Sequence, residues 1–191
     1  MINTDLLLKE FGTTRVKYNE NLKYFTVDKL DKIAEFFYIA TTERELIRIL
    51  DFCFEFKIPY LVYGNGTKLI SEGSKINGLV IRNRTSGIKI VGIKGKVGKG
   101  AIGVDEARVE IESGVSLLAL NEYLEGQGLK SIEWASSLKG TIGGSILSDR
   151  ILQEKAEKIK IWSGGDIEEI DSSKLRNNYI FLSTVIKFKA R

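Results

Sequence analysis

The spacing of apolar residues in the first half of the chain predicts helices mixed with strands. From Thr42 to Lys57 the apolar side chains recur on a helical repeat. Thr42 and Glu45 also fit a capping box, so we expect a helix that begins here. Short apolar runs at 36–40 and 60–62 lie on either side of it. They predict a strand, helix, strand order.

The second half of the chain predicts mainly sheet. We expect one helix, from Val115 to Glu125, which closes at the glycines that follow it. The Gly164-Gly165 pair between two apolar runs is typical of a hairpin turn. The expected strands are 78–82, 88–93, 101–104, 107–113, 158–163, 166–171 and 179–189.

Two glycine-rich turns are the strongest candidates for binding. The first, 63–70, directly follows an apolar run, and the second, 136–145, has the composition of a loop that enters a helix. Glycine lets backbone N–H groups approach a phosphate closely, so two such turns suit a pyrophosphate. Each turn taken alone is also typical of ordinary structural turns. Neither turn matches the G-x-G-x-x-G fingerprint or a phosphate loop ending in G-K-[ST].

Several short motifs together resemble one family in their order and spacing. The first turn with its preceding strand is similar to the G-x-G-S-N turn of UDP-N-acetylenolpyruvoylglucosamine reductases, the MurB family. The segment 139–145 is similar to that family's P-G-T-V-G-G-A turn. The resemblance runs from about Glu35 to the C-terminus. The stretches that carry it are 58–70, 78–81, 111–115, 128–133 and 139–145.

The resemblance implies an α+β architecture. The family uses a two-lobed FAD-binding fold of the MurB/PCMH type, with a small βαβ lobe and a larger, mainly antiparallel sheet with helices. Residues 1–83 would form the N-terminal segment and the small FAD-binding lobe, and residues 84–191 the larger lobe. The flavin would lie in a groove between the lobes. The segment 1–30 resembles the family only faintly, and we expect it to cover the core.

The resemblance also implies FAD as cofactor and assigns residues to it. Backbone N–H groups of the first turn would hold the pyrophosphate, and Lys68 would add charge. The residues of that turn are Gly64, Asn65, Gly66 and Thr67. Those implied for the flavin and ribityl side are Ser113, Gly114, Ser136, Gly140, Thr141, Gly143 and Gly144, with Ser145 at the start of the following helix. Ser113 and Ser136 fit ordinary loop serines equally well.

The chain departs from the family at several positions. Lys68 stands where the family has Asn, and Lys139 where it has Pro. Arg176 is the nearest counterpart of the family's catalytic Arg, but the match is poor. The catalytic residues therefore stay unassigned. The family continues beyond the position of Arg191 into a substrate domain with a proton-donor Ser and a Glu. We therefore expect that domain to be absent.

Three functions remain open. The chain is a flavoprotein that needs a partner chain or performs another redox reaction, and this is the function we expect. The second possibility is a full UDP-N-acetylmuramate dehydrogenase of peptidoglycan biosynthesis. The third is a flavin-free relic that serves as an interaction or regulatory module. NADPH and a nucleotide-sugar substrate are expected only together with a partner chain. Whether the chain is an enzyme, and its oligomeric state, stay open.

Composition excludes several classes of protein. The 191 residues contain no histidine, which excludes a Ser-His-Asp or Cys-His hydrolase, and no metal site is expected. The single cysteine, Cys53, cannot form an internal disulfide. A net charge of +4 is mild, so no nucleic-acid partner is expected. No apolar run reaches the ~20 residues that span a bilayer, so we expect a cytoplasmic protein without a membrane partner.

One substitution tests the assignment of the pyrophosphate to the first turn. We expect Gly66→Val to abolish flavin binding and to leave the fold intact, because a branched Cβ would block the close approach of the backbone to the phosphate. Flavin absorbance of the purified variant measures this, and retained flavin would refute the assignment.

Overall fold

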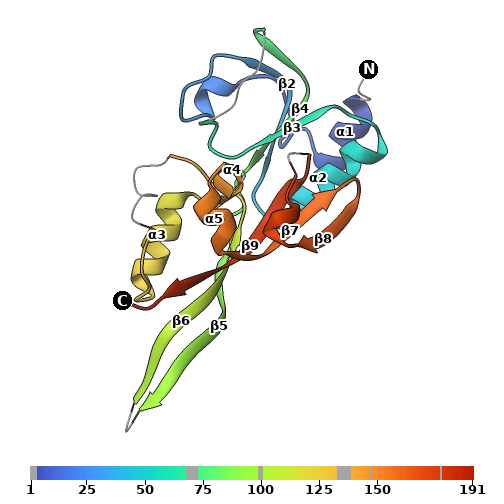
Figure 1. Cartoon of the computed structure of the whole chain (residues 1–191). Coiled ribbons are helices and arrows are strands. Elements are labelled where there is room, and N and C mark those ends of the chain that lie inside the picture. Colours follow the sequence, from blue (N-terminus) through green and yellow to red (C-terminus); the bar gives the residue numbers. More distant parts are fainter. Residues whose placement is uncertain (1–3, 68–72, 99–100, 133–138, 147, 177) are drawn as a thin grey trace. The chain divides into compact units, whose positions relative to one another are not determined.

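The computed structural model describes residues 4–67, 73–98, 101–132, 139–146, 148–176 and 178–191 (Figure 1). The chain divides into two compact units, Met1–Arg84 and Thr85–Arg191, and each contains its own sheet. Of the helices in the described ranges, none is both long and apolar enough to cross a membrane. The predictions for Lys68 and Ser136 lie outside the described residues.

The first unit is built on a four-stranded mixed sheet in the order β1-β2-β4-β3. β1 runs antiparallel to β2, whereas β2, β4 and β3 are parallel. The predicted strand, helix, strand order is confirmed as β2, α2 and β3, and β4 is inserted between the two strands. The elements are α1 (Thr4–Phe11), β1 (Lys17–Asn21), the 3-10 helix η1 (Leu22–Tyr24), β2 (Ile33–Ala40), α2 (Glu43–Glu55), β3 (Tyr60–Tyr63) and β4 (Lys75–Asn83).

Both faces of this sheet are covered. Successive side chains of β2 point to opposite faces, so Tyr38 and Phe37 enter different cores. On the Tyr38 side, Phe11 of α1 packs edge-on, 5.6 Å from Tyr38 and 5.2 Å from Phe52 of α2 between ring centroids. On the other side, Phe37 packs against Phe25, which follows η1, at 4.7 Å. The N-terminal segment therefore contributes to the core on both faces.

The second unit contains a five-stranded antiparallel sheet in the order β5-β6-β9-β7-β8. The predicted hairpin at Gly164-Gly165 is confirmed, and both glycines have positive φ, 60° and 97°. The elements are β5 (Ile88–Gly98), β6 (Ala101–Glu112), α3 (Leu117–Gly126), α4 (Ile142–Ile146), α5 (Arg150–Lys155), β7 (Ala156–Ser163), β8 (Asp166–Ile170), the 3-10 helix η3 (Ser172–Lys174) and β9 (Ile180–Lys189).

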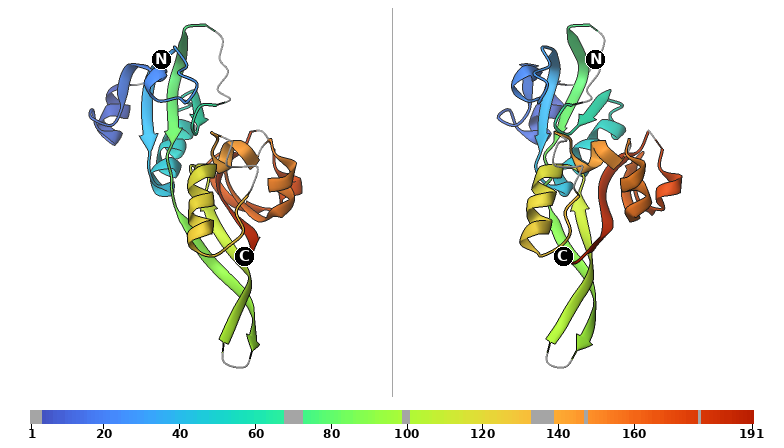
Figure 2. Two further views of the ribbon diagram at one scale, coloured as in Figure 1. Left: turned by 90° about the vertical axis from the view of Figure 1, so that its left-hand side faces the viewer. Right: turned by 60° about the vertical axis from the view of Figure 1, so that its left-hand side comes forward.

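The expectation of two separate strands at 101–104 and 107–113 is wrong. Residues 101–112 form the single strand β6, and Ser113 follows it. The apolar alternation breaks because the register shifts opposite Lys94 and Gly95, which leaves Asp105 as an extra residue in the ladder. β6 pairs with β9 only over its inner half, Glu106–Glu112, so the rest of β5 and β6 forms a two-stranded ribbon (Figure 2).

One apolar cluster forms the core of the second unit. Leu117, Leu120 and Leu124 lie on one side of α3 and are fully buried. They belong to the same cluster as Val109 of β6 and Ile186 of β9. The predicted helix at 115–125 is therefore confirmed, with its first turn capped by the side chain of the residue before it, Ser116.

The start of α2 is held by a network around Glu45. Thr42 Oγ1 accepts a hydrogen bond from Glu45 N at 3.2 Å, which is half of the predicted capping box. The Glu45 carboxylate accepts from Thr41 N at 2.9 Å and not from Thr42 N. Arg15 Nη1 donates to its other oxygen at 2.6 Å. The hydrogen bond from Arg15 is the main cause that lowers the pKa of Glu45 to about 2.

We predict that Glu45→Gln flattens the acid dependence of stability. The folded-state pKa of about 2 lies below the ordinary value of 4.5, so the ionised carboxylate stabilises the fold fully above pH 4.5 and this stabilisation is lost as the pH falls toward 2. The variant loses about 1 kcal/mol of unfolding free energy at pH 7, a value kept small by solvent screening. Urea unfolding between pH 2 and pH 7 measures both effects.

The matched control is Glu55→Gln, because Glu55 is exposed at the other end of the same helix. It should keep the acid dependence of the unsubstituted protein. An equal pH slope in Glu45→Gln and the unsubstituted protein would contradict the role given to the network.

Candidate functional site

The first glycine turn lies where parallel strands end. It follows β3 directly, and β3 is paired with β4, which in turn pairs with β2, all in the same direction. Sheets of parallel strands bind ligands beyond the carboxyl ends of their strands. The turn is tied to the chain after η1, because Val27 N donates to Asn65 O at 2.9 Å. The predicted position of the turn, at the exit from a strand, is confirmed.

Close packing against Thr26 explains the glycine at position 66. Gly66 has a φ of 75°, and a Cβ on it would lie 2.5 Å from Thr26 Cγ2. Thr26 is itself fixed, since its Oγ1 donates to Leu22 O at 3.0 Å and accepts from Leu30 N at 2.8 Å. The expectation that Gly66→Val leaves the fold intact is therefore wrong. A branched side chain would collide with Thr26 and strain the backbone, whatever the turn binds.

The same turn presents unused backbone donors. In the part of the chain that the structure describes, the N–H groups of Gly64, Gly66 and Thr67 donate no hydrogen bond. Asn65 lies between them and supplies the carbonyl that holds Val27. These three N–H groups are therefore available to an anionic acceptor, which backbone amides bind in other proteins.

Arg82 is a site residue that the sequence reasoning missed. It lies on β4 in register with Tyr63, the last residue of β3, which immediately precedes Gly64. Its Nε is buried and has no hydrogen-bond partner among the described residues. Burial lowers the pKa of Arg82, although an arginine remains cationic at neutral pH. The available signal was an arginine that ends the apolar run Leu79–Ile81.

Tyr63, which is in register with Arg82, carries no charge at neutral pH. Its ring is buried, and burial raises the pKa of its hydroxyl to about 12. The hydroxyl donates to Phe25 O at 3.4 Å. Tyr63 therefore offers Arg82 no counter-charge at neutral pH, and the guanidinium keeps its full charge next to the turn.

In the second unit, the second glycine turn is joined to the turn after β6. Leu117 N donates to Gly140 O at 3.2 Å, and Ile142 N donates to Val115 O at 2.8 Å. These bonds form an antiparallel bridge between Ser116 and Thr141. The bridge brings together the predicted residues on the two segments. They are Ser113 and Gly114 on one side, and Gly140, Thr141, Gly143, Gly144 and Ser145 on the other. A helix, α4, does follow from this turn, but it begins at Ile142, so the prediction that Ser145 stands at its start is wrong.

Donors on both bridged segments are already used inside the unit. On the second turn, Gly143 N donates to Ser113 O at 2.8 Å, and on the turn after β6, Gly114 N donates to Thr85 Oγ1 at 3.0 Å. Among the described residues, the N–H groups of Gly140 and Thr141 donate no hydrogen bond. The second turn therefore offers two adjacent donors, and Gly143 serves close packing.

Arg176, the nearest counterpart of the family's catalytic Arg, is exposed between η3 and β9. Its backbone carbonyl accepts from Tyr179 N at 3.2 Å. Catalytic side chains are normally held by packing and hydrogen bonds. The structure gives the Arg176 side chain neither of these within the described residues.

We predict that Gly143→Ala destabilises the second unit and that Gly144→Ala does not. A Cβ on Gly143 would lie 3.0 Å from both Ser113 Cβ and Ser113 O and 3.4 Å from Phe181 Cδ1, whereas a Cβ on Gly144 would lie at an ordinary 3.6 Å from Thr141 Oγ1. Overpacking of this kind costs about 1–3 kcal/mol. Thermal unfolding of both variants compares the two positions. Equal melting temperatures would contradict the close packing described for Gly143.

The sequence is similar to those of several UDP-N-acetylenolpyruvoylglucosamine reductases. UDP-N-acetylenolpyruvoylglucosamine reductase from Streptococcus thermophilus is 27% identical over 182 residues, which cover 92% of this chain and 55% of the relative. The chain spans about half the length of the curated relatives it matches.

Solved structures show the fold. The chain superposes on UDP-N-acetylenolpyruvylglucosamine reductase (MurB) from Thermus caldophilus with a TM-score of 0.67 at 19% identity, covering 93% of this chain and 63% of that one. It superposes on p-cresol methylhydroxylase with substrate bound with a TM-score of 0.61 at 15% identity, covering 96% and 42%. The predicted α+β fold of the MurB/PCMH type is confirmed, with a small mixed sheet and an antiparallel sheet.

The family follows from a match that includes both glycine turns. Residues 34–151, more than half of the chain, match the family described as "FAD binding domain". The predicted resemblance to MurB is confirmed at the level of distant homologues. The chain therefore belongs to the FAD binding domain family and is related to MurB within it.

Proposed function

We propose that this chain binds FAD and forms the flavin-holding part of a reductase of the UDP-N-acetylmuramate dehydrogenase type. NADPH and a nucleotide-sugar substrate would be bound only together with a partner chain that supplies further residues. The relationship to UDP-N-acetylenolpyruvoylglucosamine reductases supports this proposal, as does the share of those relatives that the chain spans. When bound, FAD supplies the redox chemistry, and the protein supplies binding and orientation.

The observation that carries the proposal is the donor set at the first turn. A pyrophosphate needs several N–H donors and a nearby positive charge, in a place where water does not compete fully. Gly64, Gly66 and Thr67 provide free N–H groups, and Asn65 completes the turn. Arg82 provides a cation whose buried Nε lacks an acceptor. An unpaired buried donor costs about 1–3 kcal/mol, so an anionic acceptor there would remove that penalty.

In the second unit, we assign the flavin and ribityl contacts to the bridged segments. The free N–H groups of Gly140 and Thr141 would donate to ligand oxygens. Ser113, Gly114 and Gly143 would contribute through the shape of the backbone around the ligand, because their hydrogen bonds fix the course of that backbone. The remaining assigned residues, Gly144 and Ser145, lie in α4, and Ser145 is buried.

One observation favours a second candidate, a flavin-free interaction or regulatory module. The second turn is held by hydrogen bonds from Ile142 and Gly143 to the turn after β6. It therefore keeps its shape from contacts within its own unit and needs no ligand for this. A chain that had lost its cofactor would retain the same fold.

We predict that the purified protein takes up FAD and retains its visible absorption after desalting. Arg82→Gln should weaken FAD binding by about 10-fold or more, because a hydrogen bond to a charged group contributes about 1.5–3 kcal/mol. Arg44→Gln is the matched control, since Arg44 is an exposed arginine on α2. It should leave the dissociation constant unchanged. Fluorescence quenching of FAD measures all three proteins.

The outcomes separate the two candidates. A colourless protein that takes up no FAD would contradict the flavoprotein and leave the flavin-free module. Equal affinities of the unsubstituted protein and a folded Arg82→Gln variant would remove Arg82 from the site. Circular dichroism melting of the variant checks that it is folded.

A further inference from the structure

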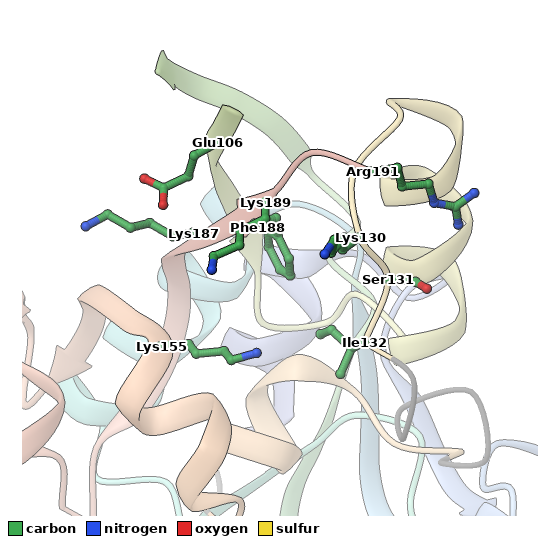
Figure 3. Close-up of a pocket in the computed structure, with 9 residues that line it drawn as sticks. All are labelled: Glu106, Lys130, Ser131, Ile132, Lys155, Lys187, Phe188, Lys189 and Arg191. Carbon is green, nitrogen blue, oxygen red and sulfur yellow. The ribbon is translucent and has the colours of Figure 1, made fainter. Parts of the chain in front are cut away.

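A basic cavity of about 710 Å³ opens on the second unit at the end of β9, separate from the glycine turns (Figure 3). Five cationic side chains and one carboxylate line it. They are Lys130, Lys155, Lys187, Lys189, Arg191 and Glu106. The whole chain has a net charge of only +4, so this cavity holds an unusual share of its positive charge.

The sheet topology creates this cavity. β7 pairs with β9 only as far as the Ala156–Ile186 pair, so the last residues of β9 extend beyond β7. There the chain after α3 takes the place of β7, and Lys130 N donates to Lys189 O at 2.8 Å. Lys155 is the last residue of α5, immediately before β7 begins. Three separate segments therefore bring their side chains to the gap that β7 leaves.

Two of the five cations are neutralised by ion pairs. Lys187 Nζ lies 2.5 Å from Glu157 Oε1, and Arg191 Nη2 lies 3.1 Å from Glu125 Oε1. In Figure 3 the side chain of Lys187 extends toward the side of Glu106, and that of Arg191 points away in the opposite direction. These two side chains are therefore occupied at the rim of the cavity.

The other three cations have no such partner. Within the described part of the chain, Lys130, Lys155 and Lys189 form no ion pair. Figure 3 shows their ammonium groups directed into the same region, around Phe188 and Ile132. Like charges gathered in one concave place repel one another, and an anion between them would relieve that repulsion.

The wall behind the lysines is apolar. Phe188 and Ile132 are each only 5% exposed and belong to the core of the unit. An apolar wall lowers the local dielectric on one side, which strengthens the attraction between an ammonium group and an anion. Because the wall belongs to the core, it is rigid and holds the bases of the lysine-bearing segments in place.

We propose that this cavity binds a small molecule that carries two or more phosphate groups. Lysine binds phosphate as a point charge, and three unpaired lysines match an anion of two or more charges. A concave cavity of this volume fits a compact anion, whereas a nucleic acid is bound by basic side chains spread along an extended surface. This site goes beyond the proposed flavin function and does not depend on it.

The test is a ¹⁵N NMR titration of the full chain with sodium pyrophosphate at constant ionic strength. The amide signals of Lys130, Lys155 and Lys189 should shift together along one saturable binding curve. Lys130→Gln and Lys155→Gln should each weaken binding by about fivefold or more, since a hydrogen bond to a charged group is lost in a partly exposed place. Lys174→Gln, an exposed lysine on η3, is the matched control and should leave binding unchanged.

Because NMR reports each amide separately, binding at this cavity is distinguished from binding at Gly64, Gly66 and Thr67. The absence of saturable shifts at the three lysines would overturn the proposal, whether or not the first turn responds. Equal weakening by Lys174→Gln would show general attraction to a basic surface and would also overturn it. The same result follows if a short single-stranded DNA binds through these lysines more tightly than pyrophosphate does.

Discussion

Close backbone packing at two glycines is the constraint on which both candidate binding turns depend. Gly66 packs against Thr26 so tightly that a Cβ has no space, and its φ of 75° is one that glycine adopts without strain. Gly143 packs against Ser113 and gives its N–H to the carbonyl of that residue. Each turn is therefore shaped by contacts inside its own unit. Its donors are positioned before any ligand arrives, which reduces the entropy cost of binding.

This packing determines which groups remain for a ligand. At the first turn, the backbone uses the Asn65 carbonyl to hold the turn and leaves the N–H groups of Gly64, Gly66 and Thr67 without an acceptor. Arg82 adds a half-buried cation, with its Nε buried, at the carboxyl end of the same parallel strands. The positive charge, the free N–H donors and the direction of the strands thus all favour binding of an anion at this turn. The family match supports FAD as the molecule that contains this anion.

Local sequence signals predicted much of the fold. The helical repeat with Thr42 at its start predicted α2, and Gly164-Gly165 predicted the β7–β8 hairpin, because both signals act within a few residues. The bulge at Asp105 was not predictable, since it depends on how β6 is matched to its neighbours. The N-terminal helix α1 also escaped notice, because its apolar face is defined by partners far along the chain.

The candidate site was predictable only as a set of turns. Glycine content located both turns, but which N–H groups are free depends on long-range bonds such as Gly143 to Ser113. Arg82 becomes meaningful only when β4 is placed beside Tyr63. The most direct test of the anion site at the first turn is a crystal structure of the protein grown with FAD. We expect the pyrophosphate within hydrogen-bond distance of the Gly64, Gly66 and Thr67 amides. FAD bound with its pyrophosphate elsewhere, or not bound, would contradict this assignment.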